Sequence, residues 1–448
     1  MTGSQSLEAL ITRLGGDDPV IRAEAADYLL RDIANAAPRL IATLRQLSTR
    51  AWADPRAAAA VEALVDLLGS GGDVVLDPLV AAVPAAWAAD RADAEKRWCV
   101  VPPWALKSEV LVLHRVFENL SVSDDAKYLP LLRDREPLVR WWGLWALARS
   151  GSAASRFLDV VLPLVDDRAS VVSNRAFATL DAMGSEALAK LRELGQEPGP
   201  AQGPALSAVA ALGGWPLLDS TQRALLTQRV EDKVAHEAPQ SMWVGGLEPN
   251  WRGDRDLMGD WTGDWLAVPT NDQTALLDAL GLVEAMPTTM QKGMHISINV
   301  DCVYITPQLD GWTLVFGYVL PDGISVDSVR ECVVGLSRRF GSAQCYGFEE
   351  TWAGWALAEH GELVRLRLSG EFAEAEEQIG PPHPAELDAG WQENEPHEYP
   401  GWSSTSVAHL MSLNPRAIGS HTRVRGHGLV ADTSAQWHQS LTRWMQFA

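Results

Sequence analysis

DREPLVRWWGLWALARSG, residues 134–151, is the stretch that decides the fold of the first half of the chain. Its apolar residues recur at helical spacing, and a loop aspartate precedes them. Residues 167–184, DRASVVSNRAFATLDAMG, repeat this plan, and residues 17–30, DDPVIRAEAADYLL, repeat it more weakly. The matching positions are Val139 with Val172, Gly143 with Ala176, Leu147 with Leu180, and Val139-Arg140 with Ile21-Arg22. We interpret the three copies as second helices of helical hairpins.

The three copies resemble the HEAT/armadillo repeat. Each has a loop aspartate, then a Val-Arg or similar pair, then small and large apolar residues at helical spacing. The resemblance implies an α-solenoid over residues 1–196, where other stretches also have apolar residues at helical spacing. It further implies a surface that binds other macromolecules, without naming them.

Composition changes along the chain and predicts three parts. Helical repeats occupy residues 1–196, and an acidic α+β domain with a helical tail occupies residues 267–448. Residues 197–266 form a Pro/Gly- and Trp-rich connector with one helix at 220–236; proline and glycine alternate in its first part, which disfavours a regular helix there. We expect Trp243, Trp251, Trp261 and Trp265 to anchor this connector to a core.

The third part mixes strand and helix patterns, which indicates an α+β fold. We predict helices at 272–280, 326–340, 407–413 and 435–447, strands at 294–305, 311–317 and 345–348, and a hairpin that pairs 353–358 with 363–368. Gly341 is expected to end the second of these helices. Residues 304–317 (YITPQLDGWTLVFG), 337–341 (SRRFG) and Asn414-Pro415 resemble a module of uncharacterised actinobacterial proteins. That resemblance implies a fold and no activity.

Composition places the chain among ordinary soluble proteins, because 47% of its 448 residues are hydrophobic and 21% are charged. No signal peptide or apolar run of membrane-spanning length is visible, so we expect a cytoplasmic location. The four cysteines lack CxxC spacing, which predicts reduced and mostly buried thiols. Six lysines against thirty-one arginines, with abundant alanine, suggest a bacterial protein.

The net charge of −21 is concentrated in the second half. Residues 200–448 hold 15 basic and 31 acidic side chains, which gives −16, and residues 349–398 hold thirteen acids against Arg365 and Arg367. Such a field repels a phosphate backbone and attracts a basic protein. The simpler interpretation is that the charge only keeps the protein soluble.

Catalytic motifs are sparse. Residues 426–431 match the letters of a dinucleotide fingerprint, but too little chain follows them for a βαβ unit, and P-loop, HExxH and GxSxG motifs do not occur. His383, Glu386, His397 and Glu398 could ligate a metal, yet a solvated charged loop is the simpler interpretation. The neighbouring carboxylates Glu349 and Glu350 point to opposite faces of a strand, which favours a partner-facing or structural role. We therefore expect a non-enzymatic protein without a cofactor or metal.

The clearest binding candidates are Trp141 and Trp145. If Val139, Gly143 and Leu147 face the core, a rotation of 100° per residue places both tryptophans on the other side of the helix, which lines the concave surface in HEAT-type solenoids. Tryptophan is enriched in interface hot spots. The alternative is that both rings pack against a neighbouring helix or the second domain. Arg22, Arg140 and Arg175 are expected to pair with acids between repeats, such as Asp134 and Asp167.

Our leading hypothesis is a protein–protein interaction scaffold, possibly immunity- or antitoxin-like in that it binds a basic partner. The residues predicted to contact the partner are Trp141, Trp145, Glu349, Glu350, Glu374, Glu376 and Glu377. The first rival is an enzyme or small-molecule sensor with a pocket between the solenoid and the α+β domain. The second is nucleic-acid binding by the helical half, which its own slight acidity disfavours. The sequence leaves the oligomeric state open.

Overall fold

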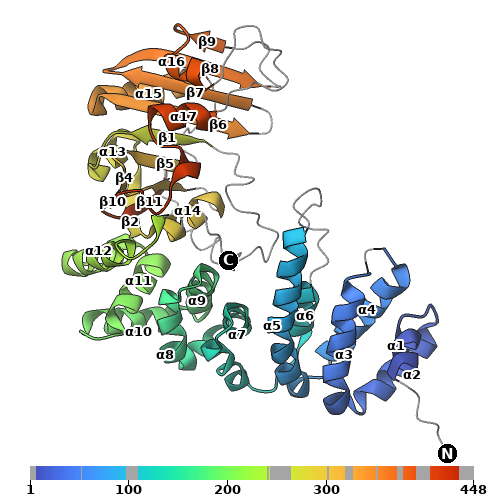
Figure 1. Cartoon of the computed structure of the whole chain (residues 1–448). Helices are drawn as coiled ribbons and strands as arrows, with labels where there is room; N and C mark the ends of the chain where they lie inside the picture. The colour runs from blue at the N-terminus through green and yellow to red at the C-terminus, as the bar shows by residue number, and fades with distance from the viewer. Residues whose placement is uncertain are drawn as a thin grey trace, which may run out of the picture. The chain divides into compact units, whose positions relative to one another are not determined.

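The computed structural model describes residues 7–51, 53–96, 109–239, 242, 264–299, 302–317, 326–349, 352–370, 377–389 and 404–432. The chain divides into two compact units between Gly184 and Ser185 (Figure 1). Within the described residues the first unit is helical, and the second combines helices with an antiparallel sheet, which confirms the predicted classes in this coarse form. In the described part of the chain, no helix combines the length and apolarity needed to cross a membrane.

The first unit contains nine α-helices among its described residues. They are α1 (Leu7–Leu14), α2 (Pro19–Leu30), α3 (Ile33–Ser48), α4 (Pro55–Gly69), α5 (Asp73–Lys96), α6 (Glu109–Asn119), α7 (Pro137–Arg149), α8 (Leu158–Val161) and α9 (Ser170–Ala182). Asp18 and Asp54 cap α2 and α4, since each carboxylate accepts a bond from the backbone N–H two residues on. Helix α7 packs against α9, and α3 packs against α4, α5 and α6.

The second unit begins with three helices, α10 (Ser185–Gln196), α11 (Gln202–Gly213) and α12 (Ser220–Val234). Helix α11 corrects the prediction that the Pro/Gly-rich stretch after residue 197 is irregular. Its only proline, Pro204, lies in the first turn, where the missing N–H is tolerated. A capping box between Asp219 and Gln222 starts α12, the one helix predicted in this stretch.

A nine-stranded antiparallel sheet follows, in the order β2-β11-β3-β5-β1-β6-β7-β8-β9. Its strands are β1 (Trp265–Val268), β2 (Val283–Thr288), β3 (Val303–Ile305), β5 (Thr313–Gly317), β6 (Ser342–Glu349), β7 (Trp352–Glu359), β8 (Glu362–Gly370), β9 (Glu377–Ile379) and β11 (Gly428–Asp432). Strands β4 (Gln308–Leu309) and β10 (Val424–Arg425) form a separate pair. The remaining helices are α13 (Gln273–Ala279), α14 (Met290–Asn299), α15 (Val326–Phe340), α16 (Pro384–Asp388) and α17 (Ser404–Met411).

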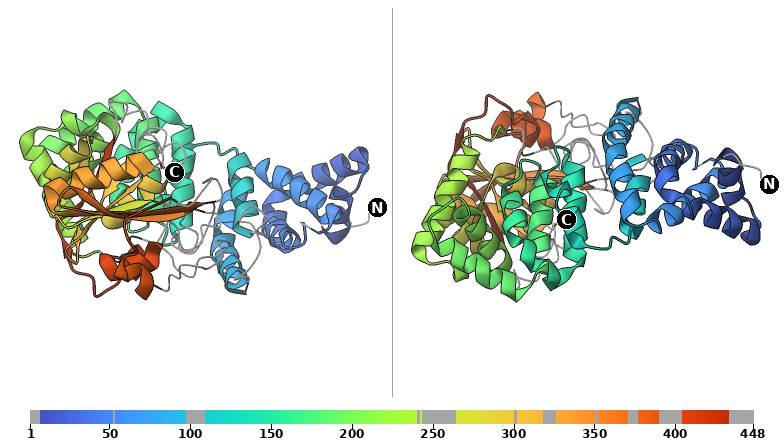
Figure 2. Two further views of the ribbon diagram at one scale, coloured as in Figure 1. Left: turned by 90° about the horizontal axis from the view of Figure 1, so that it is seen from above. Right: turned by 90° about the horizontal axis from the view of Figure 1, so that it is seen from below.

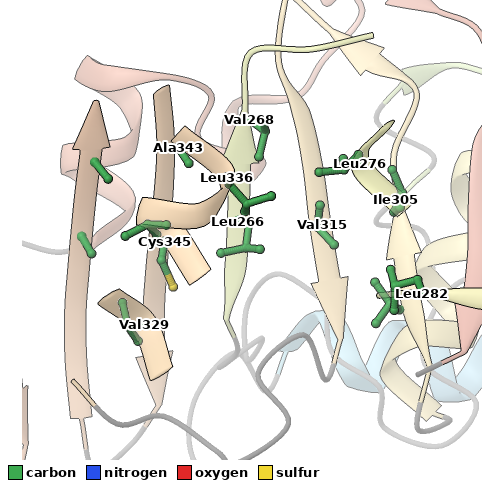
Figure 3. Close-up of a cluster of buried hydrophobic side chains, with 14 of the residues drawn as sticks. Leu266, Val268, Leu276, Leu282, Ile305, Val315, Val329, Leu336, Ala343 and Cys345 are labelled. Atoms are coloured by element: carbon green, nitrogen blue, oxygen red, sulfur yellow. The ribbon is translucent and has the colours of Figure 1, made fainter. Parts of the chain in front are cut away.

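One face of the sheet carries aliphatic side chains and packs under α13 and α15. Leu266, Val315 and Cys345 of three strands belong to one buried cluster with Val329 and Leu336 of α15 (Figure 3). The other face is covered by α14, α16 and α17, and Figure 2 shows α15 and α17 on opposite sides of the sheet. Because successive residues of a strand point to opposite faces, this arrangement places two different cores on the two sides.

The second face carries a row of rings that we call the aromatic row: Tyr304, Phe316, Trp265, Tyr346 and Trp355. They stand directly opposite one another on β3, β5, β1, β6 and β7, and each is at most 1% exposed. The ring centroids of Trp265 and Tyr346 are 5.0 Å apart and nearly parallel. Such cross-strand aromatic pairs stabilise a sheet and fix its register. Trp265 therefore belongs to the sheet core, whereas Trp243, Trp251 and Trp261 lie outside the described residues.

Three sequence predictions for this unit need correction or completion. Residues 294–305 were expected to be one strand, but α14 covers 290–299 and only Val303–Ile305 is strand. The Glu237 carboxylate accepts the N–H groups of Met290 and Gln291, at 2.9 and 2.8 Å, and so caps this helix from a distant part of the chain. The fingerprint-like residues 426–431 overlap β11, which lies second from one edge of the sheet. The helix expected at 435–447 lies outside the described residues.

The thiols of Cys332 and Cys345 are expected to resist alkylation in the folded protein. Burial raises the pKa of Cys332 to about 11 and raises the pKa of Cys345, the latter also through Asp264 and Cys332. The thiolate is the reactive form, so labelling by iodoacetamide stays slow until the pH approaches these raised pKa values. Peptide mapping after timed labelling at neutral pH checks this, with the unfolded protein as the control. Labelling of either thiol as fast as in denaturant would contradict it.

Candidate protein-binding surface

Two features position helix α7, which carries both predicted tryptophans: the residues at its N-terminus, and the close contact of Gly143 with the neighbouring segment. The Asp134 carboxylate accepts the Glu136 N–H at 2.8 Å, and Pro137 occupies the first turn. A Cβ on Gly143 would lie 2.8 Å from the Leu132 side chain, so glycine is what lets the helix sit this close to its neighbour. These contacts determine which face of α7 is left for other partners.

Arg140 of α7 links the loop before α7 to Asp167 in the loop before α9. Its Nε and Nη2 donate to both oxygens of Asp167 at 2.7 and 2.8 Å, and its Nη1 donates to the carbonyls of Asp134 and Arg135. The predicted pairing of Arg140 with Asp167 is thereby confirmed. Arg22 of α2 makes the corresponding two carbonyl contacts, to residues 16 and 17, at 2.8 and 3.0 Å.

Trp141 is buried, with 3% of its surface exposed. Its ring lies 5.3 Å from that of His114 on α6, edge to face, and 4.7 Å below the guanidinium carbon of Arg175 on α9. The interpretation that Trp141 lines an open surface therefore needs correction: neighbouring helices of the same unit cover the ring, as the alternative interpretation held. The 100° rotation places the residue on its face correctly but does not show what packs there.

Trp145 is the half-buried ring of α7, whereas Trp142 is fully buried. His114 lies 5.9 Å from Trp145 edge to face, Phe117 lies 6.0 Å from it, and the Arg149 guanidinium carbon stands 4.8 Å from the ring centroid. Arg149 is held in turn, because its Nη1 donates to the Glu118 carbonyl at 2.7 Å. A partly accessible indole is thus fixed by contacts and a cation–π interaction before any partner arrives.

Helix α6, which contacts Trp145 through His114 and Phe117, also has an exposed face. Leu111 is 49% exposed, and Arg115 and Glu118 share its helical face. Arg115 forms a bidentate pair with Glu62 of α4; this hydrogen bond lowers the pKa of Glu62 and raises that of Arg115. A half-buried indole, with an exposed leucine and paired charges on the neighbouring helix, is the composition typical of a protein interface.

The predicted acidic contacts of the second unit are only partly described. Glu349 ends β6 and Glu377 begins β9, and two strands separate β6 from β9 in the sheet. Glu350, Glu374 and Glu376 lie outside the described residues. The structure therefore brings Trp141 and Trp145 into one aromatic cluster and does not bring Glu349 next to Glu377.

The described part of the His383/Glu386 stretch is not a solvated charged loop, because Glu386 is buried in an ion pair. Glu386 is 0% exposed and pairs with the Arg365 Nε at 3.2 and 3.1 Å, while the Trp355 Nε1 donates to it at 2.7 Å. His383 caps α16 through its Nδ1. No group of three potential metal ligands occurs among the described residues, which leave out His397 and Glu398.

Sequence reasoning missed His114 and Arg149, which fix Trp145. Arg149 was detectable, because it follows Trp145 by four residues and therefore lies over the same helical face. His114 belongs to another helix and had no local signal. Comparison with protein-family models, curated proteins and solved structures finds no match to this chain, so its function has to be argued from these contacts alone.

Proposed function

We propose that this chain is a non-enzymatic protein-binding scaffold whose helical unit is a HEAT-like solenoid. The identical carbonyl contacts of Arg22 and Arg140 support the repeat interpretation, as does the Arg140–Asp167 pair between two copies. Repeats of this type need their neighbours to bury a core, and the surfaces they leave open are where partners bind.

The observation that carries the proposal is the state of Trp145. A half-buried tryptophan that three neighbours hold in place loses little conformational freedom on binding, and its indole offers a large apolar area. The partner we infer is a basic protein, because the net charge of −21 accelerates association with positive surfaces. An immunity- or antitoxin-like role, in which the scaffold occludes a basic toxin, fits this chemistry.

Trp145→Ala is expected to abolish capture of a stoichiometric basic partner from native lysate, because it removes the apolar centre of the surface. We expect a loss of binding on the order of a hundredfold, the size typical of a hot-spot tryptophan. Capture by the immobilised full-length chain, read by mass spectrometry, measures this.

Trp215→Ala provides the matched control. Trp215 is also half-buried, and it also lies near a cation, with the Arg223 guanidinium carbon 5.8 Å from its ring, but it belongs to the second unit. The control should keep the partner. Equal capture by both variants, after their unfolding curves show that both are folded, would refute the assignment of the binding surface to Trp145.

A further inference from the structure

A basic loop interrupts the acidic second unit. Between Glu398 and Asp432 the chain contains no acidic residue. Within this interval, residues 414–427, which we call the basic loop, carry Arg416, Arg423 and Arg425, and all three side chains are exposed. In a chain with a net charge of −21, such a concentration of positive charge is unexpected.

Backbone and side-chain bonds hold the basic loop in one shape. Asn414 caps the turn at Pro415–Ala417 by accepting the Arg416 N–H at 2.8 Å, and the Thr422 hydroxyl accepts the Gly419 N–H at 3.1 Å. Further along, β10 pairs with β4, and the N–H of Asp310 donates to the carbonyl of Arg423 at 3.0 Å. The arginines therefore project from an ordered framework, which lowers the entropy cost of binding.

Little of this charge is neutralised from within the described chain. Arg423 pairs with Asp310 at 3.2 Å. Arg416 and Arg425 have no ion-pair partner among the described residues, whereas Arg330 and Arg339 of the same unit pair with Asp327 and Asp278. The guanidinium groups of Arg416 and Arg425 are thus available for a carboxylate or phosphate, which arginine binds through two parallel hydrogen bonds.

We propose that the basic loop binds a short acidic peptide segment of a protein partner, through Arg416 and Arg425. The surrounding field selects among anions, because repulsion by the acidic chain grows with the total charge of the ligand. A duplex carries one charge per about 1.7 Å of its axis, and a short peptide carries only a few. The basic loop belongs to the second unit and Trp145 to the first, and the loop would take an acidic ligand, so this proposal stands independently of the function proposed above.

The test is fluorescence anisotropy of a short, labelled, glutamate-rich peptide with the full-length protein. Arg416→Gln/Arg425→Gln should weaken binding about tenfold, as expected for the loss of two charge-assisted contacts, and binding should fall with added salt. Arg330→Gln/Arg339→Gln removes the same net charge from the same unit and should change the dissociation constant less than about twofold.

Three results would overturn the proposal: no peptide binding by the wild-type protein at low salt, equal losses in the two double variants, or tighter binding of a duplex oligonucleotide than of the peptide. Equal losses would mean that only the overall charge matters. Because Arg416 and Arg425 are exposed and make no described ion pair, their double variant should keep the wild-type unfolding midpoint. The control variant loses two exposed ion pairs and should lower the midpoint only slightly. Unfolding curves of both variants therefore show whether binding is compared between folded proteins.

Discussion

Glu386→Ala is expected to lower the free energy of unfolding of the second unit by about 3–5 kcal/mol. Arg365 and Glu386 are 1% and 0% exposed, so removing the carboxylate leaves a guanidinium buried without its counter-charge. The same substitution removes the acceptor of the Trp355 indole N–H, and Trp355 is part of the aromatic row. The carboxylate also accepts the His383 N–H at 2.9 Å, so the start of α16 loses a bond as well.

Urea unfolding followed by near-ultraviolet circular dichroism measures this loss, because the buried rings of the aromatic row contribute to the signal and lose their fixed environment when the second unit unfolds. Arg365→Met/Glu386→Leu should recover much of the stability, since an apolar pair of similar volume replaces a buried ion pair at little cost. Arg330→Ala, which breaks the exposed pair with Asp327, should cost less than about 1 kcal/mol. A similar small cost for Glu386→Ala would mean that water reaches the pair.

Gly293→Ala is expected to destabilise the same unit by about 1–3 kcal/mol, although alanine normally favours a helix. A Cβ at this position would lie 2.2 Å from Cε2 of Tyr304 and 2.8 Å from Cγ2 of Thr288. The Tyr304 ring is fully buried and stacked on Phe316, so it has no room to move aside. Helix α14 can lie this close to the sheet only with glycine here.

Gly335→Ala is the matched control, because Gly335 lies in α15 and nothing stands within 4 Å of the position its Cβ would take. At an exposed helical site this change should stabilise by about 0.5–1 kcal/mol. Thermal and urea unfolding of the two variants should therefore shift in opposite directions. A shift in the same direction would show that α14 tilts to accept the methyl group.

Local signals predicted the elements that local contacts stabilise. The hairpin of β7 and β8 follows from two alternating strands around His360 and Gly361, whose φ angles of 50° and 87° suit a tight turn. The predicted helix at 326–340 matches α15, and Gly341 ends it with a φ of 87°. In each case the apolar periodicity of the element and the glycine that ends or turns it lie within a few residues of each other in the sequence.

Elements that depend on distant residues could not be predicted. The alternation of MHISINV suits a strand, and the cap that favours α14 comes from Glu237, 53 residues before Met290. Trp141 and Trp145 lie close together on the face of α7, yet only Trp141 has Arg175 of α9 over its ring. Without an arrangement of helices in space, the sequence could not show which of the two rings remains accessible.

The position of β11 determines when the second unit can be completed. It is the last described strand, yet it lies between β2 and β3, and among the described strands it is the one that pairs with β2. Until residues 428–432 leave the ribosome, β2 has no strand to pair with and β3 keeps an open edge of unsatisfied N–H and C=O groups. The helices of the first unit depend on shorter-range contacts and can form earlier. Nascent chains therefore pass through a stage in which one unit is folded and the other still exposes a strand edge.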